Sequence, residues 1–189
     1  MKTLLVTIIA CGSLLSACSS TTSADDPSSA DAAPAEKTYP ETCSRETVEA
    51  DAKLSPFEGV GAKGGALVPS DEDFAIAATY LQLRGSPEAA KKFQETMGKI
   101  NQELAKAEGL VAFRVATSDA CGSARTLSVF KDETAMLKFV TSAAHSEAMT
   151  LATSLSRGKS KTTRWTGKQT EVTFEAGAQH LATKPGGGF

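Results

Sequence analysis

The chain has 189 residues, a formal net charge of −2 and 6% aromatic residues. This length suits one domain with a tether rather than several domains. The nearly balanced charge gives no electrostatic reason to expect a nucleic-acid partner. Because aromatic side chains are scarce, the core has to consist mainly of aliphatic residues and alanine.

The first 17 residues have the pattern of a secretion signal. Lys2 supplies a positive start, and a mostly apolar run follows from Leu4 to Leu15, with a length usual for a signal peptide. A transmembrane helix would need roughly 20 apolar residues. The end of the run, Leu15-Ser16-Ala17-Cys18, resembles the lipobox of bacterial lipoproteins. The alternative is an ordinary secretory signal with small residues at its cleavage site.

The lipobox resemblance implies a location as well as a modification. Cys18 would carry a diacylglyceryl thioether, and two or three acyl chains together anchor a protein stably to a membrane. Ser19 follows this cysteine, whereas aspartate there usually marks retention at the inner membrane. The expected location is therefore the bacterial cell envelope, on the periplasmic face of the outer membrane.

Three cysteines remain after cleavage before Cys18: Cys18 itself, Cys43 and Cys121. With Cys18 acylated, Cys43 and Cys121 are the internal pair, and an oxidising compartment favours a disulfide between them. Two free thiols or a metal site are the alternatives. These cysteines and the two histidines, His145 and His180, lack a recognisable ligand spacing, so no metal is predicted.

Composition divides the chain into five segments. Residues 19–37 are rich in Ser, Thr, Ala, Asp and Pro, and such a stretch cannot bury enough apolar surface to offset chain entropy. We expect a signal peptide, a lipidated cysteine with a disordered spacer, an irregular N-terminal extension, one folded domain and a flexible tail. Their respective ranges are 1–17, 18–45, 46–72, 73–183 and 184–189.

The folded domain begins with a strand and a helix. An apolar strand starts near Phe74 and runs to residue 83. Ser86 is the expected N-cap of the helix, with Pro87 in its first turn, and Gly109 lies near its C-terminus. Its apolar residues recur at helical spacing: Phe93, Met97, Ile100 and Leu104. Two further strands are expected at 110–117 and 125–131.

The second half repeats this order. Asp132 caps a helical pattern that continues, with room for a break, to Leu155. A strand is expected at 161–174, interrupted at Gly167, and a short helix at 175–182. The order β-α-β-β-α-β predicts an α+β, ferredoxin-like fold with a four-stranded antiparallel sheet and both helices on one face. Because the strands have no cleanly polar side, we expect the other face to meet a second copy in a homodimer, as a dimeric α/β barrel.

One segment resembles a known family. The run from Thr126 to Val140, followed by Ser142-Ala143-Ala144-His145, is similar to the central segment of dimeric α/β-barrel proteins. These include the antibiotic-biosynthesis-monooxygenase-like group and its haem-degrading relatives. Thr162-Thr163-Arg164-Trp165 resembles a strand of the same group. The resemblance covers about residues 74–182 and implies the fold rather than a reaction, since the superfamily also includes modules without a known reaction.

The resemblance also bears on cofactors. Haem-degrading members pair an asparagine on the first strand with a tryptophan on the third, and their histidine ligand lies further along the second helix. Here the first strand has no asparagine, the third-strand aromatic residue is Phe130, and Met149 lies one turn beyond His145. No cofactor is therefore predicted, although haem ligation by His145 or Met149 is left open.

Five residues are candidates for a pocket or a reaction: His145, Trp165, Tyr80, Arg114 and Met149. On an unbroken helix His145 would face away from the core residues, so a pocket position requires a helix break near Ala143-Ala144. Trp165 also suits the core or a dimer interface. A buried Arg114 needs a partner, so this residue either ends a strand in solvent or lines a polar cavity.

The sequence therefore predicts a membrane-anchored periplasmic lipoprotein whose domain binds a small ligand or has a structural role, without a proven reaction. The expected pocket is largely apolar, lies beneath the second helix and suits a small hydrophobic or planar ligand. One alternative is a cofactor-independent or haem-dependent monooxygenase-like enzyme, for which His145 is the obvious base. Another is an envelope module that binds a second protein.

Overall fold

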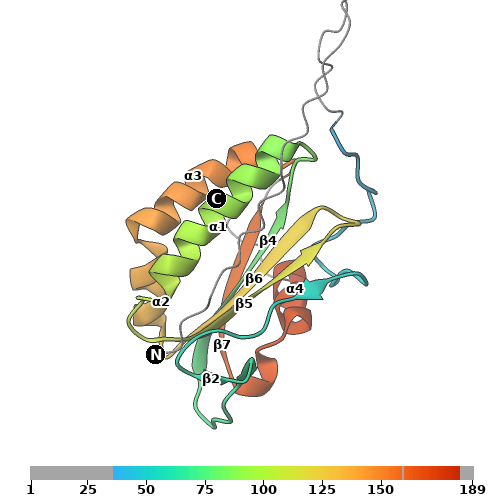
Figure 1. The fold of residues 1–189 in the computed structure, drawn as a ribbon. Helices are drawn as coiled ribbons and strands as arrows, with labels where there is room; N and C mark the ends of the chain where they lie inside the picture. The colour runs from blue at the N-terminus through green and yellow to red at the C-terminus, as the bar shows by residue number, and fades with distance from the viewer. Residues whose placement is uncertain (1–35, 159, 184–189) are drawn as a thin grey trace, which may run out of the picture. The chain divides into compact units, whose positions relative to one another are not determined.

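The computed structural model describes residues 36–158 and 160–183. The predicted signal peptide, Cys18, most of the spacer and the predicted tail lie outside these residues. Figure 1 shows a twisted sheet with α1, α2 and α3 on one side and α4 on the other. Within the described ranges, no helix has both the length and the apolar composition needed to span a membrane.

Four long strands form the sheet: β4 (Phe74–Gln82), β5 (Leu110–Ser118), β6 (Ser123–Phe130) and β7 (Lys161–Gly167). They lie in the order β5-β6-β4-β7, and every neighbouring pair is antiparallel. This arrangement, with helices between the first and second and between the third and fourth strands, is the ferredoxin-like fold. The predicted fold class is confirmed. A two-residue strand, β1 (Lys53–Leu54), pairs with the edge of β5 and makes the sheet five-stranded.

The helices begin where the sequence places their caps. α1 (Pro87–Leu104) starts after Ser86, whose hydroxyl accepts a hydrogen bond from the backbone N–H of Ala89. α2 (Glu133–Val140) starts after Asp132, whose carboxylate accepts from the N–H of Ala135. The expected break follows Val140: Ser142 adopts an extended conformation and caps a new helix, α3 (Ala143–Leu155).

Two predicted boundaries are wrong. α1 ends at Leu104 rather than near Gly109, which instead adopts a positive φ of 80° in the turn that leads into β5. The last strand ends at Gly167 rather than at residue 174. The carboxylate of Glu171 accepts a hydrogen bond from the N–H of Lys168 and closes a 3-10 turn, η1 (Gln169–Glu171), before α4 (Phe174–Thr183).

The face of the sheet opposite α1 is covered by the chain itself. Its core contains Ile76, Leu127, Val129 and Trp165, and α4 contributes Phe174. Val48, Phe57 and Leu67 pack on this core from residues 43–68, which we call the strap. The reason for expecting a second copy here was an uncovered face, and that reason is wrong. The homodimer itself stays a prediction.

The strap is attached at several points along its length. The predicted disulfide between Cys43 and Cys121 is present, with 5.5 Å between the Cα atoms. Further along, the N–H of Ser55 donates to the carbonyl of Val115 at 2.8 Å, and Glu58 pairs with Phe113. A short hairpin of β2 (Ala62–Lys63) and β3 (Ala66–Leu67) completes the segment. The segment predicted to be irregular is therefore irregular over most of its length but firmly bound.

One strap contact is a fully buried ion pair. Arg125 Nε lies 2.8 Å from Glu49 Oε2, and the side chains are only 2% and 6% exposed. The guanidinium also donates to the carbonyls of Ser44, Arg45 and Thr47. All three guanidinium nitrogens therefore donate to acceptors of the strap, as a buried charge requires.

Candidate functional site

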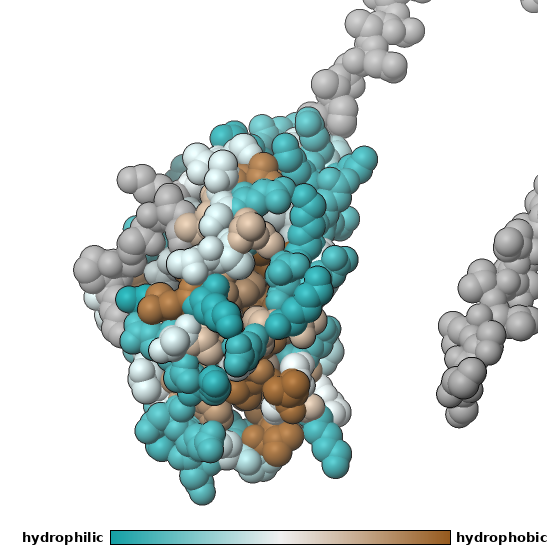
Figure 2. Space-filling model, turned by 90° about the vertical axis from the view of Figure 1, so that its left-hand side faces the viewer, coloured by the Kyte–Doolittle hydropathy of each residue, from teal (hydrophilic) through white to brown (hydrophobic). Residues whose placement is uncertain are grey.

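A cavity of about 680 Å³ lies between the helices and the sheet, on the face away from the strap. The helical spacing of α1 places Met97, Ile100 and Leu104 along one wall, and α3 contributes Ala148 and Met149 to another. Figure 2 shows the molecule from the side on which α2 and α3 lie, where apolar side chains are gathered among polar ones. The largely apolar walls follow directly from the amphipathic pattern of the two helices.

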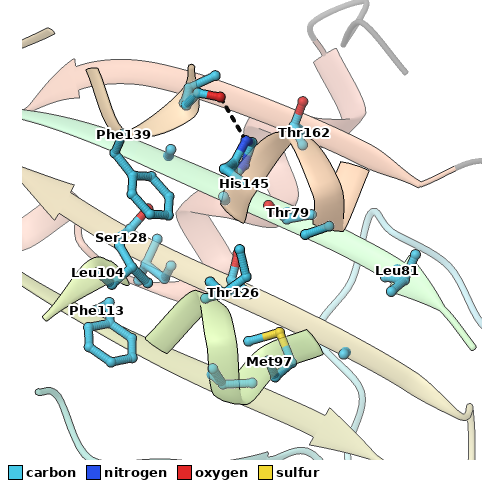
Figure 3. Close-up of a pocket in the computed structure, with 18 of the residues that line it drawn as sticks. Thr79, Leu81, Met97, Leu104, Phe113, Thr126, Ser128, Phe139, His145 and Thr162 are labelled. Carbon is cyan, nitrogen blue, oxygen red and sulfur yellow. Dashed lines mark hydrogen bonds between the residues drawn. The ribbon is translucent and has the colours of Figure 1, made fainter. Parts of the chain in front are cut away.

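The floor of the cavity is more polar than its walls. Because side chains alternate along a strand, Thr79, Thr126, Ser128 and Thr162 all face the helices from three neighbouring strands (Figure 3). Each of these residues is half-buried. The cavity therefore combines apolar walls with a floor of hydroxyl groups.

His145 lies at the start of α3 and points toward the cavity beside Thr162 and Thr79 (Figure 3). Its Nδ1 lies 2.9 Å from the carbonyl oxygen of Val140, the last residue of α2. A carbonyl can only accept, so Nδ1 carries the hydrogen, and the lone pair of the neutral ring is on Nε2. The ring also makes an edge contact with Phe139, with 5.2 Å between the centroids.

The surroundings of His145 favour its neutral form. Burial lowers the pKa of the imidazole from its ordinary value of 6.5, while the hydrogen bond to the Val140 carbonyl acts in the opposite direction. Desolvation is the larger effect because the charged form loses water on entering an apolar site. At neutral pH the ring is therefore an uncharged donor at Nδ1 and an acceptor at Nε2.

The break between α2 and α3 determines where the His145 side chain lies. On a continuous helix His145 would have faced away from the core residues. Ser142 instead caps α3 by accepting a hydrogen bond from the His145 N–H, so a new helix starts at Ala143. The break that the pocket position of His145 required is present, two residues earlier than the expected Ala143-Ala144.

The other sequence candidates do not all meet at this cavity. Met149 lines it together with His145. Tyr80 lies on the strap side, beneath the Arg125 guanidinium at 4.4 Å from the ring centroid. Trp165 is on the same side and stacks on His180 with 4.3 Å between the centroids. Both residues are nearly fully buried in that face.

Arg114 borders the cavity, but its guanidinium lies on the opposite face of the sheet. The residue borders the cavity, but its guanidinium lies 4.6 Å from the ring of Phe57 and 5.5 Å from that of Phe174, on the strap side. Burial lowers its pKa, and the charge of Glu175 partly counteracts this. Its charge is thus held between aromatic rings rather than offered to the cavity.

Asn101 was missed by the sequence reasoning. It lines the cavity from α1, and its Oδ1 is buried without a hydrogen-bond partner among the described residues. The hydroxyl floor was missed too, although a signal for it was available. Thr79, Thr126, Ser128 and Thr162 have the parity in their strands that places them on the helix face.

A metal site would need several ligating side chains close together. Within residues 36–158 and 160–183, no group of three or more His, Cys, Asp or Glu side chains is placed to hold one. For haem, the cavity wall offers the ligand types of Met97, Met136, Met149 and His145, and the two that the sequence singled out are His145 and Met149. Because they are one helical turn apart on α3, they would approach an iron from the same side.

Comparisons with known proteins show a similarity of fold alone. No family model matches the sequence, and no curated protein resembles it significantly. Among solved structures, a provisionally described monooxygenase from Fusobacterium nucleatum has a TM-score of 0.47 and 18% identity over 60% of this chain. The match spans only 48% of that protein's length.

Smaller proteins match over most of their length. A provisionally described antibiotic biosynthesis monooxygenase from Nitrosomonas europaea has a TM-score of 0.45 and 11% identity, covering 53% of this chain and 95% of its own. SnoaB, a cofactor-independent oxygenase from Streptomyces nogalater, has a TM-score of 0.42 and 15% identity, with coverages of 51% and 93%. These scores are too low to carry an argument about activity, and the fold assignment depends on the strand order above.

Proposed function

We propose that this chain is a lipid-anchored protein of the bacterial envelope whose domain binds a small, largely apolar molecule between α1, α3 and the sheet. The observation that carries the proposal is the cavity of about 680 Å³ with apolar walls and a few polar groups. Small-molecule sites typically have volumes of roughly 300–1,000 Å³ and this composition. The Leu15–Cys18 lipobox resemblance supports the anchor.

Binding without turnover is the function that the lining residues support best. The ionisable residues that border the cavity are Arg114, His145 and Arg164. The Arg114 charge lies among rings on the other face, and Arg164 is more than half exposed, 3.6 Å from Glu133. Of the lining residues that the structure describes, His145 is thus the one ionisable group suited to act inside the cavity, whereas acid–base catalysis usually needs groups matched for both proton transfers.

A cavity-filling variant tests the binding site. The chain with Cys18→Ser, which needs no detergent, is titrated with the fluorescent apolar probe N-phenyl-1-naphthylamine. Ala148→Phe places a ring in the cavity wall and should weaken probe binding at least tenfold. Ala90→Phe, at an exposed position within α1 that does not border the cavity, is the matched control and should bind as before. Equal binding by both variants, or no saturable binding at all, contradicts the proposal.

The anchor is tested separately. Cells that express the full chain are labelled with radioactive palmitate, and the label is expected on the protein. Cys18→Ala should lose it, while Cys11→Ala, a cysteine within the predicted signal peptide, should keep it. Label that persists in Cys18→Ala would rule out the lipobox assignment and, with it, the proposed location.

A second candidate function depends on one observation. The neutral imidazole of His145, with its lone pair on Nε2, is in the protonation state that a general base requires. Cofactor-independent oxygenation would need a bound molecule that forms a carbanion when this base removes a proton. Oxygen consumption with hydroquinone-like substrates, lost in His145→Gln, would support this function. An absence of uptake across such substrates removes it.

Haem binding follows from the same wall of the cavity. If haem binds, His145 or Met149 is the residue that would hold its iron, and the group would then supply the oxygen chemistry. Adding haemin to the protein should in that case shift the Soret band, and His145→Ala or Met149→Leu should abolish the shift. A spectrum identical to that of free haemin contradicts this reading.

A further inference from the structure

The hydroxyl groups on the cavity floor form a row across the sheet. Thr79 of β4 is directly opposite Thr126 of β6 on one side and directly opposite Thr162 of β7 on the other. Directly opposed residues have Cβ atoms about 4.5–5.5 Å apart. The three side chains are therefore separated by about one interstrand spacing each, and Figure 3 shows Thr79 between Thr162 and Thr126, with His145 beside it.

Two members of this row lack partners within the protein. Among the described residues, neither the Thr79 nor the Thr126 hydroxyl takes part in a hydrogen bond, and both side chains are half-buried at the cavity. The buried Oδ1 of Asn101 in the wall is likewise unpartnered. Polar groups that face an apolar space are stable when water or a ligand satisfies them. Thr79 and Thr126 are thus available hydrogen-bonding sites for a ligand.

Among residues 36–158 and 160–183, the arginines that border the cavity direct their charge elsewhere. The guanidinium of Arg164 is more than half exposed and pairs with Glu133, and that of Arg114 contacts Phe57 on the other face. The described part of the cavity lining contains no aspartate or glutamate. A charged ligand would lose its water without gaining a counter-ion, which is costly.

We propose that the cavity selects uncharged molecules that carry two oxygen atoms on the same edge, separated by about one strand spacing. The two oxygens bind neighbouring hydroxyls of the row Thr126–Thr79–Thr162, and the apolar body packs on the side chains of α1 and α3. This inference depends on the proposed ligand binding and adds to it the chemistry of the ligand. The directly opposed register of the three threonines is the observation that carries it.

Isomeric probes test the geometry without changing polarity. In 1,3-dihydroxynaphthalene both oxygens lie on one ring in the meta relation, close to one strand spacing, whereas in 1,5-dihydroxynaphthalene they lie on opposite edges. Each competes with N-phenyl-1-naphthylamine on the Cys18→Ser chain, together with 1-naphthoate as the charged analogue. The 1,3 isomer should bind several-fold more tightly than the 1,5 isomer, and 1-naphthoate should bind most weakly.

Thr79→Val removes the central hydroxyl and keeps the shape of the side chain. It should weaken binding of the 1,3 isomer by about 2- to 10-fold, the usual effect of one hydrogen bond, and affect N-phenyl-1-naphthylamine little. Thr163→Val is the matched control, because alternation along β7 turns its side chain away from Thr162 and the row, and its hydroxyl is buried without a partner among the described residues. Thr126→Val repeats the test at a second hydroxyl, and thermal unfolding confirms that each variant is folded.

The outcomes separate the two proposals. If N-phenyl-1-naphthylamine binds but the two isomers compete equally, or both Thr79→Val and Thr126→Val leave the 1,3 isomer unaffected, the row does not select the ligand and the inference is wrong. Preferred binding of 1-naphthoate overturns it as well. If no probe binds saturably, the proposed ligand binding itself fails.

Discussion

The two faces of one sheet are built in contrasting ways. On the strap face Ile76, Leu127 and Val129 are fully buried, an ion pair is desolvated, and a disulfide closes the chain. On the helix face the same strands present half-buried hydroxyls to a cavity of about 680 Å³. Cavities and unpaired polar groups both reduce stability. The contrast teaches that the strap face supplies the stability that allows the helix face to remain hollow.

Removing the disulfide should cause the largest loss of stability on the strap face. Cys43 and Cys121 are 78 residues apart, and in the chain-entropy model a loop of this size stabilises the fold by about 4–5 kcal/mol. Cys43→Ser combined with Cys121→Ser should therefore lower the free energy of unfolding by an amount of that order. Urea unfolding followed by circular dichroism measures the change.

Reduction of the wild-type protein provides the control for that measurement. Dithiothreitol should lower its unfolding midpoint to nearly that of the double variant and leave the double variant unchanged. A wild-type midpoint that does not respond to complete reduction would show that the strap is held by its other contacts alone.

Breaking the buried ion pair should have the next largest effect. Glu49→Ala leaves Arg125 charged and buried, and it also removes the acceptor of the Ser123 hydroxyl, 2.6 Å away. Loss of one partner of a buried pair typically costs about 3–5 kcal/mol. The hydrogen bonds from Arg125 to the strap carbonyls remain. The loss in free energy of unfolding, measured by urea unfolding, should therefore lie in the lower part of that range.

Glu46, an exposed glutamate three positions before Glu49, gives the comparison. Glu46 lies 3.7 Å from Arg45, and both side chains are well exposed. Glu46→Ala should change the unfolding midpoint very little, since such pairs contribute little. Similar losses of unfolding free energy in Glu49→Ala and Glu46→Ala would mean that water reaches the Arg125 guanidinium more readily than its burial indicates.

The smallest expected effect is on the helix face and depends on pH. Burial lowers the pKa of His145 in the folded protein below 6.5, so the unfolded chain binds a proton more readily in the window below that value. Stability should therefore fall as the pH decreases from neutral through this window. His145→Gln, which can still donate to the Val140 carbonyl, should make that dependence shallower.

The comparison with His180 sharpens this test. His180 stacks on Trp165 on the strap face, so His180→Gln changes a histidine without touching the cavity. Unfolding free energies of both variants at pH 5 and pH 7 separate the two contributions. An unchanged pH dependence in His145→Gln would show that the imidazole is as easily protonated in the cavity as in water.

Local patterns predicted most of the secondary structure. Ser86 and Asp132 cap α1 and α2 as expected, and the apolar spacing of residues 93, 97, 100 and 104 identified the inner face of α1. The strand after Lys161 was predicted too long, because its apolar pattern continues past the turn that the Glu171 side chain closes. A side-chain bond of this kind leaves no trace in hydrophobic periodicity.

The candidate site was predicted in part. His145 and Met149 do line one cavity, but Tyr80, Trp165 and the Arg114 charge lie on the other face. Strand parity already separates Tyr80 from Thr79, so this division could have been recognised. It was missed because the aromatic and charged residues were judged by their chemistry rather than by the face on which their strand places them.

The sequence by itself determined the order of strands and helices, their caps and the available cysteine pair, because these depend on residues close together in the chain or on simple elimination. Only the tertiary structure decided that the strap covers the second face, that Glu49 meets Arg125 and that three threonines lie in register. Such contacts join residues that are far apart in sequence, as in the 76-residue separation of Glu49 and Arg125. Their pairing depends on the three-dimensional path of the backbone, which local periodicity does not record.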